Sequence, residues 1–224
     1  MVMTRGIVMK GQTVILLHGV AKSKHCMNKL GRHLQAQGYA VVNQTYPSFS
    51  DTLPVLAEKT IAQLLAKCPQ DQPVHFVTHS MGGILVRYYL AKHKVNNLGK
   101  VVMLGPPNQG SALVDILNKL DAKQHLSTQP IMQLGTHHNG LTQQIGKADF
   151  EVGIIAGKRS VKPILSLFLS GRDDGKVCVE NTKLAGMKAH ITLPVTHPFM
   201  MKNHQVIKQV IHFLASGDFY RTNK

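Results

Sequence analysis

Short apolar runs recur along the chain, and stretches with helical spacing separate them. Each run is rich in Val, Ile and Leu, as is typical of strands that are buried on both faces. The stretches between them repeat apolar residues every three or four positions, which predicts amphipathic helices. Alternation of this kind indicates an α/β fold, with a mostly parallel central sheet and helices on both faces. The expected strands are 13–17, 40–45, 74–78, 100–104, 151–156, 164–169 and 189–195.

We expect six or seven strands, because the two runs between 151 and 169 need not both belong to the sheet. A chain of 224 residues predicts a single domain, residues 1–224. The pattern is least regular at about 105–150, where we expect a small cap. His137 and His138 lie side by side there, but no third ligand follows at a spacing suited to a metal, so we predict no metal site.

The clearest local signal is the end of the run 74–78. The run stops just before Ser80, and apolar residues at helical spacing begin with Ile84 and Leu85. A strand, a sharp turn and a helix would place Ser80 at the apex, with its hydroxyl lifted out of the sheet. Gly82 removes a side chain from the crowded side of this turn. A serine before a helix is also a common cap, so the turn alone leaves catalysis open.

A serine nucleophile needs a base, and the base needs an orienting carboxylate. Asp173 and Asp174 follow the apolar run 164–169 and precede a glycine, which would place a carboxylate at the carboxyl edge of the sheet. An ordinary Asp-Gly turn is the alternative. His197 follows the last expected strand and precedes a helix expected to begin near Asn203. A base in that loop could reach a serine on a central strand.

The first expected strand ends in His18-Gly19-Val20. A loop that opens at this point can aim a backbone N–H at a carbonyl oxygen under attack. The predicted donors are the N–H groups of Val20 and Met81. For His18 we favour a structural role, in which its side chain braces the loop.

These pieces, in this order, resemble the α/β-hydrolase family, and within it the small lipases and esterases. The resemblance spans nearly the whole chain and is carried by "VILLHGVAKS", "VTHSMGGILVRYYL", "VVMLGPPNQGS", "DDGKV" and "LPVTHPFMMKN". It implies that Ser80 is the nucleophile, Asp174 the acid and His197 the base. The family's Asn-Asp-Gly pattern favours Asp174 over Asp173. The chain departs from the usual pattern at Thr78, where most relatives have Gly and some lipases have Ala or Thr.

The resemblance further implies a serine ester hydrolase, a carboxylesterase or lipase, with Val20 and Met81 forming the oxyanion hole. An acyl-enzyme forms and is hydrolysed, and no metal or organic cofactor is needed. The expected substrates are small-molecule or lipid esters, with short to medium acyl chains because the cap is small. One alternative is an acyltransferase or thioesterase that uses the same three side chains. Another is a non-catalytic binding protein with the hydrolase fold. The oligomeric state stays open.

The chain carries a formal net charge of +15, from 26 Lys and Arg against 11 Asp and Glu. Aromatic residues make up only 5% of the chain, and basic residues do not cluster with them, so we do not expect nucleic-acid binding. Four basic residues flank the predicted oxyanion loop and acid, and a basic rim there could attract an anionic membrane or anionic substrates. They are Lys22, Lys24, Arg172 and Lys176.

Cysteine usage suggests a reducing compartment. There are three cysteines, none in a Cys-x-x-Cys pair, and Cys26 falls on the apolar face of an expected helix. No signal peptide pattern is visible, and no apolar run is long enough to span a membrane. We therefore expect a cytoplasmic protein, or a secreted one if a signal peptide has been removed.

Overall fold

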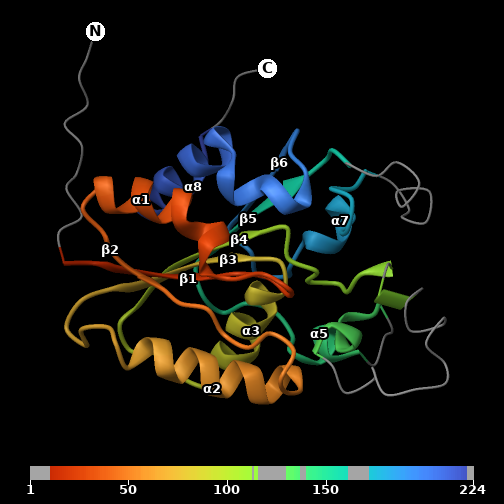
Figure 1. Ribbon diagram of the computed structural model, residues 1–224, viewed down its shortest axis with the longest axis horizontal. Coiled ribbons are helices and arrows are strands. Elements are labelled where there is room, and N and C mark those ends of the chain that lie inside the picture. Colours follow the sequence, from red (N-terminus) through yellow and green to blue (C-terminus); the bar gives the residue numbers. More distant parts are fainter. Residues whose placement is uncertain (1–10, 113, 116–129, 137–139, 161–171, 221–224) are drawn as a thin grey trace, which may run out of the picture.

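The fold is built on one six-stranded parallel sheet with helices on both faces (Figure 1), which confirms the expected α/β class. A computed structural model describes residues 11–112, 114–115, 130–136, 140–160 and 172–220. The strand order is β2-β1-β3-β4-β5-β6, and every neighbouring pair is parallel. The strands are β1 (Thr13–Leu17), β2 (Ala40–Asn43), β3 (Val74–His79), β4 (Leu98–Leu104), β5 (Val152–Gly157) and β6 (Ala189–Leu193).

Two pairs of helices cover the sheet (Figure 1). One face carries α1 (Asn28–Ala36) and α8 (His204–Ser216), and the other carries α2 (Leu53–Leu65) and α3 (Met81–Leu90). Asn203 caps α8, because its side chain accepts hydrogen bonds from the N–H groups of the first turn. The shorter helices are η1 (Lys24–Met27), η2 (Pro130–Leu134), α5 (Leu141–Gln144), α7 (Val179–Thr182) and η3 (His197–Lys202).

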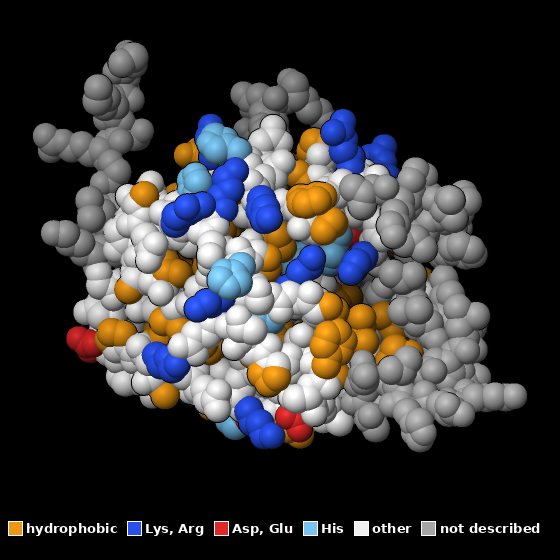
Figure 2. All heavy atoms as spheres, viewed as in Figure 1, with side chains coloured by type: hydrophobic (Ala, Val, Ile, Leu, Met, Phe, Trp, Pro, Cys, Tyr) orange, Lys and Arg blue, Asp and Glu red, His pale blue; other side chains and the backbone are white. Residues whose placement is uncertain are grey.

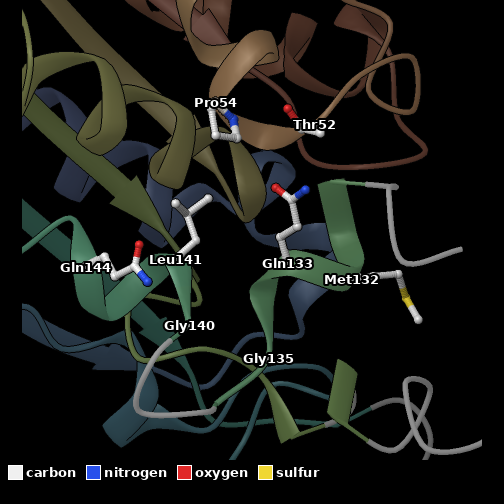
Figure 3. Close-up of a pocket in the computed structure, with 8 residues that line it drawn as sticks. All are labelled: Thr52, Pro54, Met132, Gln133, Gly135, Gly140, Leu141 and Gln144. Carbon is white, nitrogen blue, oxygen red and sulfur yellow. The ribbon is translucent and has the colours of Figure 1, made fainter. Parts of the chain in front are cut away.

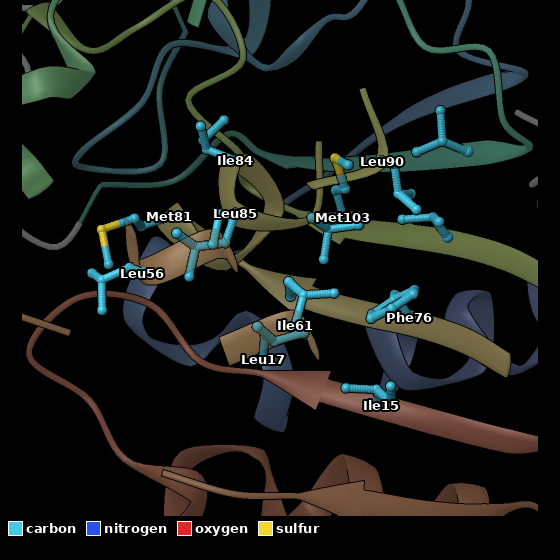
Figure 4. Close-up of a cluster of buried hydrophobic side chains, with 14 of the residues drawn as sticks. Ile15, Leu17, Leu56, Ile61, Phe76, Met81, Ile84, Leu85, Leu90 and Met103 are labelled. Carbon is cyan, nitrogen blue, oxygen red and sulfur yellow. The ribbon is translucent and has the colours of Figure 1, made fainter. Parts of the chain in front are cut away.

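The core lies in two layers, one on each side of the sheet. Side chains alternate across a strand, so Val14 and Leu16 of β1 pack toward α1 and α8, whereas Ile15 and Leu17 pack toward α2 and α3. Figure 4 shows the second layer, in which Phe76 of β3 lies among side chains of β1, α2 and α3. All five residues of β1 and all six of β3 are buried. Burial on both faces is the physical reason why these strands read as continuous apolar runs.

The observed strands follow the expected ones closely. β4 begins two residues earlier than expected, and β2 ends at Asn43. β6 ends at Leu193 because Pro194, which follows it, has no N–H to donate to the sheet. The seventh expected strand, 164–169, lies outside the described residues, as does part of the cap expected at about 105–150.

One edge of the sheet gathers the segments that carry the candidate chemistry. In a parallel sheet all carboxyl ends lie at the same edge, so the segments that follow β1, β3, β4 and β6 meet there. Those segments hold Val20, Ser80, Gly105 and His197. The fold therefore brings together residues that are more than a hundred positions apart in the chain.

Candidate active site

Ser80 occupies a sharp turn between β3 and α3. Its backbone has φ 54° and ψ −126°, a conformation that costs energy in any residue other than glycine. A side chain at Gly82 would not fit, because an added Cβ would lie 2.9 Å from the carbonyl oxygen of His18 and 3.0 Å from Leu17 Cβ. The start of α3 therefore packs directly on the end of β1, and the strained turn projects Ser80 at the sheet edge.

Thr78 replaces the glycine that is usual two positions before the serine. It is fully buried, and its Oγ1 points toward Gly83. A Cβ on Gly83 would lie 3.2 Å from Thr78 Oγ1 and 3.3 Å from Met103 Sδ. The bulk of the threonine is accommodated because position 83 has no side chain. The departure from the usual pattern is thus compatible with the turn.

Asp174 and His197 form a buried pair. The Nδ1–H of His197 donates to Asp174 Oδ2 at 2.7 Å, and the backbone N–H of His197 donates to the carbonyl oxygen of Asp174 at 2.9 Å. The other carboxylate oxygen of Asp174 accepts from the N–H groups of Lys176 at 3.0 Å and Val177 at 2.9 Å. These bonds fix the carboxylate and the imidazole ring, and in a neutral ring with the proton on Nδ1 they leave Nε2 of His197 as the acceptor. The neighbouring carboxylate of Asp173 accepts instead from the N–H of Gly175, at 2.7 Å.

This pair lies beside the turn that carries Ser80. The N–H of Ser80 donates to the carbonyl oxygen of Leu104 at 2.9 Å. The next residue, Gly105, has φ +54°, and an added Cβ there would lie 3.0 Å from Asp174 Oδ2 and 3.1 Å from His197 Nδ1. The carboxyl end of β4 therefore touches Ser80 on one side and the Asp174–His197 pair on the other. The structure brings together the three residues that the sequence predicted as nucleophile, acid and base.

The loop after β1 is braced against Ser80 by His18 and Tyr46. Nε2 of His18 accepts from the backbone N–H of Tyr46 at 3.2 Å, so Nδ1 carries the proton and donates to the Gly19 carbonyl oxygen at 2.8 Å. The hydroxyl of Tyr46 donates to the carbonyl oxygen of His18 at 2.7 Å, and the two rings stack at 4.2 Å. Burial lowers the pKa of His18, which keeps the ring neutral. An added Cβ on Gly19 would lie 3.0 Å from Ser80 Cβ, so the loop backbone contacts the serine.

Two backbone N–H groups are available next to Ser80. Within the described part of the chain, neither the N–H of Val20 nor that of Met81 donates to a protein acceptor. The residue after Val20 is Ala21, which also has φ 54° and whose N–H donates to Ser48 Oγ at 3.2 Å. Ala21 and Ser80 are the two residues other than glycine with positive φ among those described. Sequence reasoning did not predict the strain at Ala21, because alanine gives no signal for it.

His79 is a further residue of the site that sequence reasoning missed. Its Nε2–H donates to the backbone carbonyl oxygen of His197 at 2.9 Å, and the two rings lie 4.7 Å apart. Burial lowers the pKa of His79 well below its usual value, and the nearby His197, Lys176 and Lys22 lower it further. His79 is therefore neutral. His79 is one of 13 histidines, and no sequence pattern distinguishes it from the others.

Arg87 ties α3 to the segment that follows β4. The guanidinium is buried and donates to four oxygens: Asn108 O and Oδ1 at 3.0 Å each, Thr142 O at 3.1 Å and Gly146 O at 2.9 Å. Burial lowers its pKa to about 10. Asn108 in turn donates to the carbonyl oxygen of Thr182, at 2.8 Å. The only sequence signal for this role of Arg87 was its isolated charge inside the apolar stretch of α3.

A pocket of about 440 Å³ opens between the start of α2, η2 and α5 (Figure 3). Gln133 joins two of these elements, because its Oε1 accepts from the N–H of Leu53 at 3.0 Å. Ser80, Asp174 and His197 are not among the residues that line the pocket, so its position does not by itself mark the reacting atoms. The lining residues are Thr52, Pro54, Met132, Gln133, Gly135, Gly140, Leu141 and Gln144.

His137 and His138 lie outside the described residues. Among the residues that the structure does describe, no three His, Cys, Asp or Glu side chains gather in a group that could hold a metal ion.

Comparison with known proteins identifies the family. Residues 12–143 match the profile of the alpha/beta hydrolase fold, which is more than half of the chain. The chain therefore belongs to the α/β-hydrolase family. No curated protein sequence matches it at a significant level.

Solved structures with the same fold include several lipases. The mature lipase BlEst2 of Bacillus licheniformis is 20% identical with a TM-score of 0.67, over 90% of this chain and 91% of that one. Lipase B of Aspergillus fumigatus is 16% identical with a TM-score of 0.65, over 94% and 54%. Phospholipase PlaB of Legionella pneumophila is 20% identical with a TM-score of 0.61, over 77% and 45%. Identities this low establish the fold and leave the substrate open. In the described residues of this chain, no helix is long and apolar enough to cross a membrane.

Proposed function

We propose that the protein is a serine ester hydrolase, a carboxylesterase or lipase, that works through an acyl-enzyme. The observation that carries the proposal is the 2.7 Å hydrogen bond between His197 Nδ1 and Asp174 Oδ2 beside the strained turn at Ser80. A buried carboxylate that fixes an imidazole next to a projecting serine is the arrangement that activates a hydroxyl as a nucleophile. The lipases with the same fold agree with this chemistry.

In the first half of the reaction, Ser80 Oγ attacks the carbonyl carbon of the ester. Nε2 of His197 takes the hydroxyl proton, and Asp174 stabilises the imidazolium that results. The N–H groups of Val20 and Met81 donate to the oxyanion; neither is engaged elsewhere in the described residues. When the tetrahedral intermediate collapses, the bond to the leaving alcohol breaks, and His197 returns its proton to the alkoxide oxygen.

In the second half, water replaces the alcohol. His197 takes a proton from the water as the water attacks the acyl-enzyme carbonyl, and the same two N–H groups hold the second oxyanion. The bond between the acyl carbon and Ser80 Oγ then breaks, Ser80 recovers a proton from His197, and the carboxylic acid leaves. An acyltransferase would differ only in accepting an alcohol at this stage, and a thioesterase only in its leaving group.

The experiment is a panel of soluble p-nitrophenyl esters of graded acyl chain length, with a matched thioester and an added alcohol acceptor. The proposal predicts turnover of the esters, with water as the main acceptor and the highest kcat/KM at short to medium chains. Ser80→Ala should lose at least about 10³-fold in kcat. Faster turnover of the thioester than of the matched ester would favour a thioesterase. Transfer of the acyl group to the added alcohol would favour an acyltransferase. Turnover by Ser80→Ala within tenfold of the unmodified protein would contradict the serine mechanism, and an absence of turnover with every substrate would favour a binding protein.

A further inference from the structure

Exposed hydrophobic side chains gather at the edge of the sheet that carries the candidate active site. Phe49 is 49% exposed, Val55 38% and Phe199 54%. Phe49 follows Ser48, whose Oγ accepts from the loop after β1, and Phe199 lies two residues after His197. Val55 lies in the first turn of α2, which begins at this edge. Only one other large hydrophobic side chain among the described residues is comparably exposed.

Basic side chains surround the same edge. Lys22 lies close enough to Lys176 to lower its pKa, in addition to the larger effect of burial. Burial raises the pKa of the Cys26 thiol, and Lys22 and Lys202 act to lower it, so both lysines lie near this thiol. The backbone of Lys202 also accepts a hydrogen bond from Lys29 Nζ at 2.9 Å, so η3 and α1 present their lysines together. The charges of Lys22 and Lys202 therefore flank the segments that hold Val20 and His197.

Few carboxylates offset this charge. The sequence contains no Asp or Glu before Asp51, and none between Glu180 and Asp218. Asp51 is paired with Lys59 at 3.3 Å, and the carboxylates of Asp173 and Asp174 are buried. Figure 2 shows blue Lys and Arg side chains interspersed with orange hydrophobic ones on the face it displays, where red carboxylates are sparse.

We propose that this edge docks on the surface of an anionic lipid bilayer. The docking surface consists of Lys22, Lys24, Phe49, Val55, Phe199 and Lys202. An anionic bilayer attracts lysines through its surface potential and accepts aromatic side chains at the level of its headgroups. A nucleic acid would match the positive charge, but only its bases could contact the exposed phenylalanines. The basic residues here are also not interleaved with aromatic residues, as they are in nucleic-acid-binding sites. Docking in this orientation would hold the sheet edge that carries Ser80 against lipid esters, and in that respect the inference rests on the proposed function.

The test is flotation with vesicles of phosphatidylcholine alone and of equal parts phosphatidylcholine and phosphatidylglycerol, at low and at high ionic strength. We expect binding to the anionic vesicles only, and weaker binding at high ionic strength. The double variant Lys22→Glu/Lys202→Glu should bind at least about 25-fold more weakly, at about fivefold for each lysine. Phe199→Ala should cost about fivefold because less apolar surface enters the interface.

Two matched control variants carry changes of the same kind at the opposite edge of the sheet. Lys94→Glu reverses an exposed charge after α3, and Tyr220→Ala removes an exposed aromatic ring after α8. Both should bind within twofold of the unmodified protein. Equal binding to neutral and anionic vesicles, equal losses in the control variants, or tighter binding to duplex DNA than to the anionic vesicles would overturn the proposal.

Flotation requires no turnover, so it separates this inference from the proposed function. Protein that labels with a fluorophosphonate but does not float would contradict the docking surface and leave the hydrolase proposal standing. Protein that floats as predicted but neither labels nor hydrolyses esters would contradict the hydrolase proposal alone.

Discussion

His79 Nε2 lies 2.9 Å from the backbone carbonyl oxygen of His197. His79 directly precedes Ser80, the proposed nucleophile, and it therefore holds His197, the proposed base. The two residues are 118 positions apart in the chain. His79 is buried and neutral, and the bond uses its one N–H. The contact links the turn after β3 to the segment after β6. A change at position 79 should therefore move the imidazole of His197 relative to Ser80.

Replacement of His79 tests this positioning role. His79→Leu keeps similar bulk but removes the donor, and His79→Gln retains an N–H at similar reach. We expect His79→Leu to lower kcat by about 10- to 100-fold with little change in KM, because a small displacement of a catalytic group carries a cost of that size. His79→Gln should restore most of the loss. Equal impairment in both variants would indicate packing rather than the hydrogen bond.

Substitution of the two adjacent aspartates separates their roles. Asp174→Asn should lower kcat by about 10³- to 10⁴-fold, because an amide at this position favours the wrong tautomer of His197. Asp173→Asn should stay within tenfold, since His197 Nδ1 donates to Asp174, whereas the carboxylate of Asp173 accepts from the N–H of Gly175. Steady-state kinetics on one soluble ester compares them. A larger loss in Asp173→Asn would refute the assignment of the acid.

Arg87 should contribute to stability rather than to the reaction. Arg87→Met leaves three backbone carbonyl oxygens and one side-chain oxygen without their charged donor, so we expect the free energy of unfolding to fall by about 2–4 kcal/mol. Hydrogen exchange should increase most over 140–146, where two of those carbonyls lie. Arg32→Met, on the exposed face of α1, is the control and should stay within about 0.5 kcal/mol. Similar destabilisation by both variants would argue against the role of the buried network.

His75 should make the fold sensitive to acid. Burial and the nearby Lys100 lower the pKa of His75 to about 4, against an ordinary value of 6.5. The unfolded chain therefore takes up a proton between pH 6.5 and 4 that the folded chain does not, and stability falls as the pH falls through this window. The contribution of this one group should be about 2 kcal/mol less at pH 5 than at pH 7.

Denaturant unfolding of the unmodified protein and of His75→Gln at both pH values isolates the effect. The variant lacks this titrating group, so its stability should change less between pH 7 and pH 5. An identical change in the two proteins would show that His75 does not retain a low pKa in the fold.

The sequence predicted the elements that depend on local pattern. β1 and β3 were located because strands buried on both faces are continuous apolar runs, and the turn at Ser80 because a strand pattern changes there to a helical one. Contacts between distant segments carry no such signal. Tyr46 braces His18 from 28 positions away, and nothing in either side chain indicates the partner. The strain at Ala21 likewise depends on the surrounding loop and not on the residue itself.

The acid and the base represent an intermediate case. Asp174 and His197 were predicted from their places after strand ends and from the family resemblance, since parallel topology gathers such positions at one edge. Their separation of 2.7 Å, and the way Gly105 makes room for them, required the folded chain. Arg87 had a weak signal as a lone charge in an apolar helix, but its four acceptors come from Asn108, from Thr142 of the short helix α5 and from Gly146, and no sequence pattern links these residues to Arg87.

The most direct test of the account is the site at which a fluorophosphonate probe attaches. The folded protein should gain one adduct, and tandem mass spectrometry should place it on Ser80. His197→Ala should label at least about 100-fold more slowly, because the hydroxyl loses its base, whereas His93→Ala, an exposed histidine at the opposite edge, should label at the normal rate. Absence of an adduct on correctly folded protein, or an adduct on a different residue, would contradict the assignment of Ser80 as the nucleophile.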